Sequence, residues 1–141
     1  MLKPASIGDT LSTQYFDVIV NGVRIRSLVG GSFNPQRADK GNVFMVLNVT
    51  FKNTDSESRM IEEGVVYLVI NGKQYMFDKT ELVMFDGYGT YFDQINPLTS
   101  KTTKLVYQIP ANVVAKGFYH PGRAEYDQLI YLGDIIGKVE K

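Results

Sequence analysis

Residues 41–57 read Gly-Asn-Val-Phe-Met-Val-Leu-Asn-Val-Thr-Phe-Lys-Asn-Thr-Asp-Ser-Glu, and this stretch decides the fold class. From Val43 to Phe51 every second residue is apolar, while the residues between them change from Phe and Val to Asn and Thr. Because successive side chains on a strand point to opposite faces, the pattern predicts a strand with one buried face and one face that becomes solvated along its length. The strand is predicted to end at residues 53–56, whose short polar side chains favour a turn.

Two more segments predict strands that flank this one. Residues 65–70 are all apolar, and Asn71-Gly72 then leads into residues 73–77. Asn-Gly readily adopts the positive φ values of a tight turn, so the segment predicts a hairpin. Residues 102–109 alternate between apolar and polar side chains and are followed by Pro110, which predicts a strand that closes on the first one.

The remaining segments are less uniform. Residues 14–28 predict extended structure, in which Asn21-Gly22 is either a hairpin turn or a bulge in one long strand. Residues 111–116 are consistent with one helical turn, with proline near its start and glycine past its end. Residues 126–132 predict a final strand, after which Gly133 begins a frayed tail.

Length and composition are those of a single domain. The chain has 141 residues, of which 44% are hydrophobic, and a domain of this size hides roughly two-thirds of its unfolded-chain surface. We expect one domain over residues 1–141, with its core at about 6–132 and a tail at 133–141. Short strands with regular turn signals and no long helix predict an all-β fold, an antiparallel β-sandwich of about seven to nine strands.

Charge and composition exclude several classes of function. Fifteen basic and fifteen acidic residues cancel, whereas nucleic-acid binding draws most of its affinity from an excess of basic residues; we therefore expect no nucleic-acid partner. The chain has no cysteine, which excludes disulfides, thiolate nucleophiles and cysteine-based zinc sites. No run approaches the eighteen or so apolar residues of a membrane-spanning helix, and the first residues lack the apolar segment of a signal peptide.

The search for catalytic chemistry gives a negative result. His120 is the only histidine, and it precedes Pro121-Gly122, where we interpret it as a solvated turn residue. The sequence has no nucleophile elbow, no glycine-rich phosphate loop and no dinucleotide fingerprint. We therefore predict a protein that is not an enzyme, with no catalytic residues, no metal ligands and no cofactor.

A glycine- and aromatic-rich loop at residues 86–96 is the best candidate for ligand binding. Its aromatic rings could stack on a sugar or anchor a protein partner, and its acids could join a calcium site; alternatively, the rings only pin the loop onto the sandwich. The candidate ligand-binding residues are Asp86, Tyr88, Tyr91, Phe92 and Asp93.

The order and spacing of several segments resemble a bacterial extracellular domain family of unknown function, mostly lipoproteins of Gram-positive organisms. This family is similar in fold to the mycobacterial immunoprotective secreted antigen, an immunoglobulin-like β-sandwich. The segments that carry the resemblance lie between about residues 6 and 132 and are Ile7–Leu11, Phe16–Asn21, Gly41–Asp55 with its Lys52-Asn53-Thr54 ending, Asn96-Pro97, Leu105–Tyr107 and Ile109-Pro110.

The resemblance implies an immunoglobulin-like sandwich at the cell surface or secreted, often tethered by an N-terminal lipid, with no catalytic residues to carry over. This chain lacks the signal segment and the cysteine that such a tether needs. We expect a non-enzymatic extracytoplasmic interaction or structural module with a protein or cell-envelope partner. The alternatives are a soluble domain that holds calcium or a glycan at residues 86–96, or a phage or virion component.

Overall fold

The structure is a computed structural model that describes residues 4–83, 85, 87–89 and 94–139. Within these residues the protein is all-β, with no helix. The described strands with five or more residues are β3 (Phe16–Arg26), β6 (Asn42–Asn53), β8 (Val65–Ile70), β9 (Lys73–Phe77), β11 (Ser100–Pro110), β12 (Val114–His120) and β13 (Ile130–Ile136). The two-residue strands are β1 (Ala5–Ser6), β2 (Leu11–Ser12), β4 (Leu28–Val29), β5 (Gln36–Arg37), β7 (Arg59–Met60) and β10 (Gln94–Ile95).

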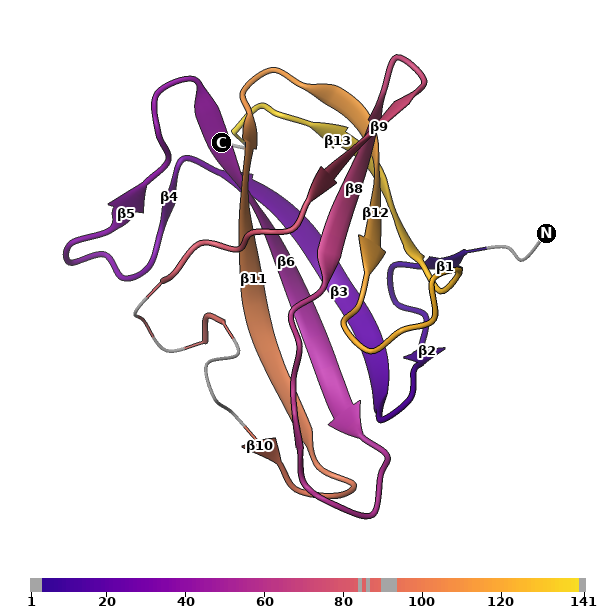
Figure 1. Cartoon of the computed structure of the whole chain (residues 1–141). Helices are drawn as coiled ribbons and strands as arrows, with labels where there is room; N and C mark the ends of the chain where they lie inside the picture. Colours follow the sequence, from indigo (N-terminus) through magenta and orange to yellow (C-terminus); the bar gives the residue numbers. More distant parts are fainter. Residues whose placement is uncertain (1–3, 84, 86, 90–93, 140–141) are drawn as a thin grey trace.

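Two sheets form the body of the molecule (Figure 1). The four-stranded sheet has the order β11-β6-β3-β2, and the five-stranded sheet has the order β1-β13-β12-β8-β9. All of their pairs are antiparallel except β1 with β13, which is parallel. The small β4–β5 sheet projects to one side of the body, on the side opposite the N-terminal strands β1 and β2 (Figure 1).

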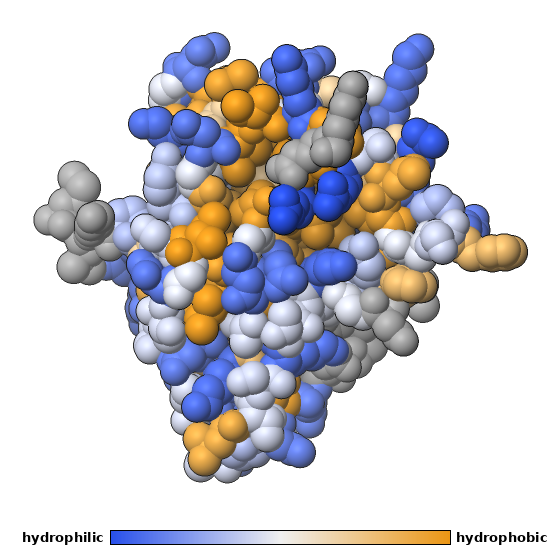
Figure 2. Space-filling view, turned by 180° about the vertical axis from the view of Figure 1, so that it is seen from behind, coloured by the Kyte–Doolittle hydropathy of each residue, from blue (hydrophilic) through white to orange (hydrophobic). Residues whose placement is uncertain are grey.

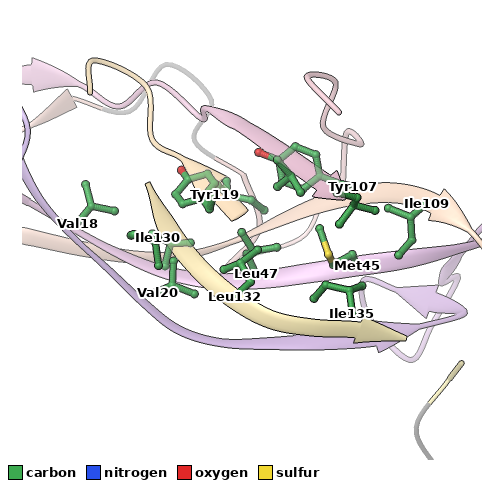
Figure 3. Packing of buried hydrophobic residues seen from close by; sticks show 14 of the residues in the cluster. Val18, Val20, Met45, Leu47, Tyr107, Ile109, Tyr119, Ile130, Leu132 and Ile135 are labelled. Atoms are coloured by element: carbon green, nitrogen blue, oxygen red, sulfur yellow. The ribbon is translucent and has the colours of Figure 1, made fainter. Parts of the chain in front are cut away.

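The main hydrophobic core lies between the two sheets. Side chains of β3, β6 and β11 meet side chains of β8, β12 and β13. The residues labelled in Figure 3 show this packing for β3, β6 and β11 against β12 and β13. Tyr107 and Tyr119 are fully buried there, one from each sheet. Buried apolar area of this kind stabilises a fold by about 25 cal/mol per Å², so contact between the two sheets is the main source of stability.

The strand predicted from the alternation of residues 43–52 is confirmed as β6, which lies between β3 and β11. On its second face Phe44 and Val46 are buried, Asn48 and Thr50 are half-buried, and Lys52 is exposed. The predicted gradient from apolar to solvated along this face is therefore present. The predicted hairpin is also confirmed, since Asn71 and Gly72 join β8 to β9 with φ values of 51° and 80°.

The Asn21-Gly22 segment is a bulge and not a hairpin turn. β3 runs without interruption from Phe16 to Arg26, and its register against β6 shifts between Val20 and Gly22. A bulge inserts one unpaired residue and bends the strand. The segment therefore forms one long strand and not the two strands of a hairpin.

The predicted helical turn at residues 111–116 is wrong. β12 already begins at Val114, and Val113 and Ala115 are buried while Val114 is exposed. This burial period of two is set by contacts with the core, and it outweighs the proline and glycine signals that suggested a helical turn. A single helical turn is too short to be stable alone.

The predicted final strand at 126–132 is misplaced, because β13 spans Ile130–Ile136. Gly133, predicted to begin a tail, pairs with Gly117 and has a φ of 85°, and the register then shifts so that Phe118 faces Tyr131. Glycine tolerates positive φ, so it carries the strand through this bulge where the sequence suggests an end. Residues 133–136 therefore belong to the sheet.

Candidate functional site

The outer face of the four-stranded sheet carries a second apolar cluster. Its buried members are Val29, Phe44, Val46, Val83 and Val106, with Ala38 and Tyr88 packed against them. Two segments supply the residues outside the sheet: residues 28–38, which include β4 and β5, and the described residues 81–83, 85 and 87–89. We call these two segments the cover, because they shield the apolar end of the outer face from water.

Backbone hydrogen bonds fasten the cover to β11. The amide of Glu81 donates to the carbonyl of Val106 (2.7 Å), and that of Gly89 donates to the carbonyl of Lys104 (2.8 Å). Tyr88 forms a parallel bridge with Lys104. Tyr88 is thereby held as an extension of the sheet beside β11, and its ring lies beside the outer face.

The cover leaves a hollow over the adjoining part of the sheet. The larger hollow has a volume of about 490 Å³ and lies between the Gly30–Ser32 loop, Tyr88 and β3. A second hollow of about 330 Å³ continues along β3 toward Asn21 and Asn48. Both are lined by Arg24, Arg26, Val46 and Lys104; we call the two together the basic trench.

The basic trench combines positive charge with an aromatic wall and an apolar floor. Arg24 and Arg26 are exposed on β3, while Lys104 is half-buried on β11 with its Nζ 5.0 Å from the centroid of the Tyr88 ring. Among the described residues that line the trench none is acidic. The described lining therefore favours an anionic group at the centre of the trench.

One end of the basic trench is lined by the amides of Asn21 and Asn48, and hydrogen bonds lead from Asn21 to hydroxyl groups just beyond it. The β3 bulge presents Asn21, whose Nδ2 donates to Asn48 Oδ1 (2.9 Å) and to Thr50 Oγ1 (2.9 Å). The Thr50 hydroxyl in turn bonds the Thr102 hydroxyl at 2.7 Å. These side chains hold one another in place, and amides and hydroxyls can both donate and accept hydrogen bonds.

Of the five predicted ligand-binding residues, the structure places Tyr88 in the basic trench. Asp86, Tyr91, Phe92 and Asp93 lie outside the described residues. The prediction from sequence missed Arg24, Arg26 and Lys104. The spacing Arg24-x-Arg26 places both side chains on one face of a strand, and this signal was available, but the pairing of β3 with β6 and β11 was needed to bring Lys104 beside them.

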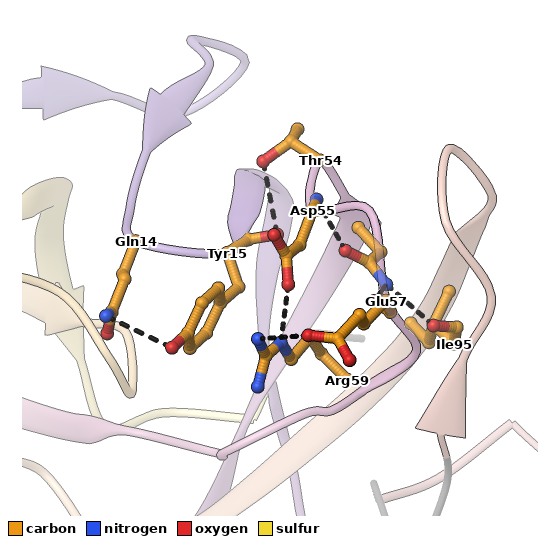
Figure 4. Close-up of polar contacts among 8 residues, drawn as sticks. Gln14, Tyr15, Thr54, Asp55, Glu57, Arg59 and Ile95 are labelled. Atoms are coloured by element: carbon orange, nitrogen blue, oxygen red, sulfur yellow. Dashed lines mark hydrogen bonds and ion pairs between the residues drawn. The ribbon is translucent and has the colours of Figure 1, made fainter.

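Groups with shifted pKa values lie away from the basic trench. Near the ends of β3 and β6, Arg59 Nε donates to Asp55 Oδ2 (2.7 Å), and this hydrogen bond is the main cause that lowers the pKa of Asp55. Figure 4 shows Arg59 between Asp55 and Glu57, and its Cζ lies 3.9 Å from the centroid of the Tyr15 ring. These contacts tie the turn after β6 to the start of β3, so we assign them a structural role.

In the part of the chain that the structure describes, no three His, Cys, Asp or Glu side chains are grouped to hold a metal ion. His120 Nε2 lies 2.8 Å from the carbonyl oxygen of Glu125 in the turn after β12. No helix in the described segments is long and apolar enough to cross a bilayer.

A third hollow, of about 320 Å³, lies where β3 and β13 meet. Its apolar lining residues are Ile7, Val23, Ile25, Leu132, Ile135 and Ile136. Seen from behind, the molecule has a broad band of apolar surface broken by hydrophilic side chains (Figure 2). Apolar atoms contribute much of the accessible surface of a folded protein, and the charged residues that line this hollow, Asp134 and Lys138, are of opposite sign.

Comparisons with known proteins agree with this architecture. A family model described as a domain of unknown function, DUF4352, matches residues 5–124. No curated protein matches the chain.

Three solved bacterial structures share the fold. An uncharacterized β-sandwich protein from Clostridium difficile 630 has a TM-score of 0.65 and 14% identity over 92% of this chain and 95% of that chain. A conserved hypothetical protein from Bacillus anthracis has a TM-score of 0.61 and 21% identity, over 92% and 96%. A candidate lipoprotein from Bacillus subtilis has a TM-score of 0.55 and 15% identity over 93% of this chain, which spans 39% of that protein. Identities this low show the fold alone, a β-sandwich.

Proposed function

The chain belongs to the DUF4352 family, a domain of unknown function, and from that premise we propose that it is a non-enzymatic binding module that works outside the cytoplasm. Its ligand site is the basic trench. The observation that carries the proposal is the grouping of Arg26, Lys104 and Tyr88 around one hollow on the outer sheet face. Function on such a fold resides in a site and not in the architecture.

Two further observations support the proposal. The described residues hold no cluster of metal-ligating groups, and the groups with shifted pKa values lie in the core or in a structural turn. One structural neighbour is a candidate lipoprotein, which favours a location at the outer side of a membrane. The seven longer strands in two facing sheets also favour the narrower immunoglobulin-like class.

The calcium alternative depends on Asp86 and Asp93. Both lie outside the described residues, so this alternative stays a prediction. The basic trench itself favours anions over cations, because its described charged residues are all basic.

Co-sedimentation with insoluble cell-wall particles of a Gram-positive bacterium tests the proposal. We expect the wild-type protein to sediment with the particles and to be released by salt, since charge supplies the attraction. The variant Arg26→Glu/Lys104→Glu should stay in solution. A control with the same change in charge, Lys73→Glu/Lys116→Glu, alters only the five-stranded sheet and should sediment like the wild type.

Two results would contradict the proposal. If the wild-type protein does not sediment, the chain does not bind the cell envelope. If the trench variant and the control lose binding equally, net charge is responsible and the site is not the basic trench. Folding of each variant is checked by its thermal unfolding transition.

A further inference from the structure

We propose that the ligand of the basic trench is an acidic oligosaccharide, that is, a short chain of sugar rings that carries carboxylate, phosphate or sulfate groups. This inference rests on the proposed function and specifies the chemistry of its ligand. It is drawn from three kinds of group that meet at the basic trench: an aromatic ring, a set of cations, and two amides that are hydrogen-bonded to each other and to a neighbouring hydroxyl.

The register fixes the order of these groups across the sheet. Tyr88 is bridged to Lys104, Lys104 lies opposite Asn48 on β6, and Asn48 lies opposite Gly22 on β3. Three inter-strand spacings of about 4.8 Å separate the Tyr88 and Gly22 backbones by roughly 14 Å across the sheet. A site of that width suits a short chain of rings better than a single small anion.

The centre of the basic trench supplies the charge recognition. Arg26 is exposed on β3 and Lys104 points from β11 over the same hollow. A guanidinium presents a planar pair of donors that matches carboxylate, phosphate or sulfate oxygens, and an ammonium adds a compact charge. Val46 forms an apolar floor between them, against which the C–H face of a sugar can lie.

The two ends of the trench supply recognition of rings and hydroxyls. Tyr88 is half-buried and offers part of its ring as a wall of the larger hollow. At the other end the hydrogen-bonded amides of Asn21 and Asn48 are held rigid by their own contacts. Because these side chains are already ordered, a bound ligand loses little affinity to fixing them.

A single-stranded nucleic acid fits this arrangement less well. Channels for single strands use successive aromatic side chains on which bases stack, whereas Tyr88 is the one aromatic residue among the described residues of the trench. The chain as a whole also carries no excess of positive charge. The amides of Asn21 and Asn48 are better suited to the hydroxyl groups of sugars.

Isothermal titration calorimetry in EDTA-containing buffer tests the inference with defined probes. The probes are a trimer of galacturonic acid, the neutral trimer of galactose, inorganic phosphate and a short single-stranded DNA. We expect the acidic trimer to bind at least tenfold more tightly than each of the other three. The substitutions Arg26→Ala, Lys104→Ala and Tyr88→Ala should each weaken binding of the acidic trimer at least fivefold, and Lys73→Ala should leave it unchanged.

Several outcomes separate this inference from the proposed function. If the protein sediments with cell-wall particles through the trench but does not bind the acidic trimer, the acidic-sugar inference is wrong and the binding module stands. Equal binding of acidic and neutral trimers would also overturn it. Tighter binding of DNA would show that the ligand is a nucleic acid. Absence of both sedimentation and sugar binding would contradict both proposals.

Discussion

Asn53 is a fully buried polar residue at one end of the sandwich, and its side chain joins three segments. Its Nδ2 donates to the carbonyls of Glu57 (2.8 Å) and Ile95 (2.7 Å), while its Oδ1 accepts from the amide of Asp55 (2.8 Å). Figure 4 shows Asp55, Glu57 and Ile95, the three residues whose backbone groups the Asn53 side chain joins. Since a buried carbonyl without a donor costs about 1–3 kcal/mol, this one amide stabilises the contact between the turn and β10.

The substitution Asn53→Asp replaces the donating amide with a carboxylate that faces two carbonyl oxygens. We expect the free energy of unfolding to fall by about 2–4 kcal/mol at neutral pH, because two carbonyls lose their donor and a charge is buried. Urea denaturation measures the change. Asn96→Asp is the control: Asn96 is exposed, and its side-chain Oδ1 accepts a bond from Ser58, which a carboxylate can also do. Equal effects of the two substitutions would refute the role given to Asn53.

The Asn53-Thr54 pair also gives a physical reason for a motif that the resemblance singled out. The amide of Thr54 donates to the carbonyl of Tyr15 (2.8 Å), so the end of β6 is joined to the start of β3. From the sequence these two residues predicted only a turn. Ile95, which Asn53 contacts, and Tyr15, which Thr54 contacts, are each about forty residues away in the chain, and local turn preferences carry no information on such contacts.

At the scale of elements, two loops cross closely beside the five-stranded sheet. Gly64 has a φ of 87°, and a Cβ atom placed there would lie 2.4 Å from the carbonyl oxygen of His120. Across the same contact, a Cβ on Gly122 would lie 2.3 Å from Glu62 Cβ. The two glycines let the segment before β8 pass against the segment after β12.

The substitution Gly64→Ala should therefore destabilise the protein by about 2–4 kcal/mol, since it combines an unfavourable φ with a backbone clash. Gly22→Ala, at a site with no atom within 4 Å of the added Cβ, should change stability by less than about 1 kcal/mol. Thermal unfolding of both variants measures the difference. A Gly64 variant as stable as the Gly22 variant would show that the crossing is not tight.

Alternation predicted β6 and β11 well, and an apolar run followed by Asn-Gly predicted the β8–β9 hairpin, because both signals depend only on local sequence. It failed at β12 and β13, where glycines allow a bulge that only strand pairing can reveal. The candidate site divides in the same way. The sequence identified Tyr88 because it lies in a glycine- and aromatic-rich loop, but its neighbour Lys104 comes from another strand, which local sequence does not reveal.

At the scale of the whole molecule, two buried tyrosines join the sheets to the segment before β8. The Tyr107 hydroxyl donates to the carbonyl of Gly64 (3.2 Å), and the Tyr119 hydroxyl donates to the carbonyl of Glu63. Burial, with a smaller contribution from Glu63, raises the pKa of Tyr107, and burial likewise raises the pKa of Tyr119 well above its ordinary value. Both side chains therefore stay neutral in the folded protein when unfolded chains begin to ionise.

This difference predicts how stability depends on pH. Below pH 10, the ordinary tyrosine pKa, the two hydroxyls are protonated in both the folded and the unfolded state, and the stabilisation is fully present. Above about pH 10 the unfolded state releases these protons first, so the free energy of unfolding falls. Each tyrosine contributes a slope of up to about 1.4 kcal/mol per pH unit. Tyr107→Phe and Tyr119→Phe should each make the slope between pH 10 and 11.5 shallower, as measured by urea denaturation.

We compare the slopes of stability against pH, and not the stabilities themselves, because each Tyr→Phe substitution also removes a hydrogen bond. That loss lowers the free energy of unfolding by the same amount at every pH. Tyr126→Phe, at a side chain that is 90% exposed, is the control and should keep the wild-type slope. Identical slopes in all three variants would contradict the prediction.

The sandwich core and the cluster under the cover have no residue in common. Mutations in residues 28–38 and 81–89 can therefore accumulate, in evolution or in a selection library, without altering the contact between the two sheets. Neighbouring strands would keep their register while the walls of the basic trench change. A single inherited scaffold could in this way give rise to modules of differing specificity, and a library randomised in these two segments would be a practical source of new binders.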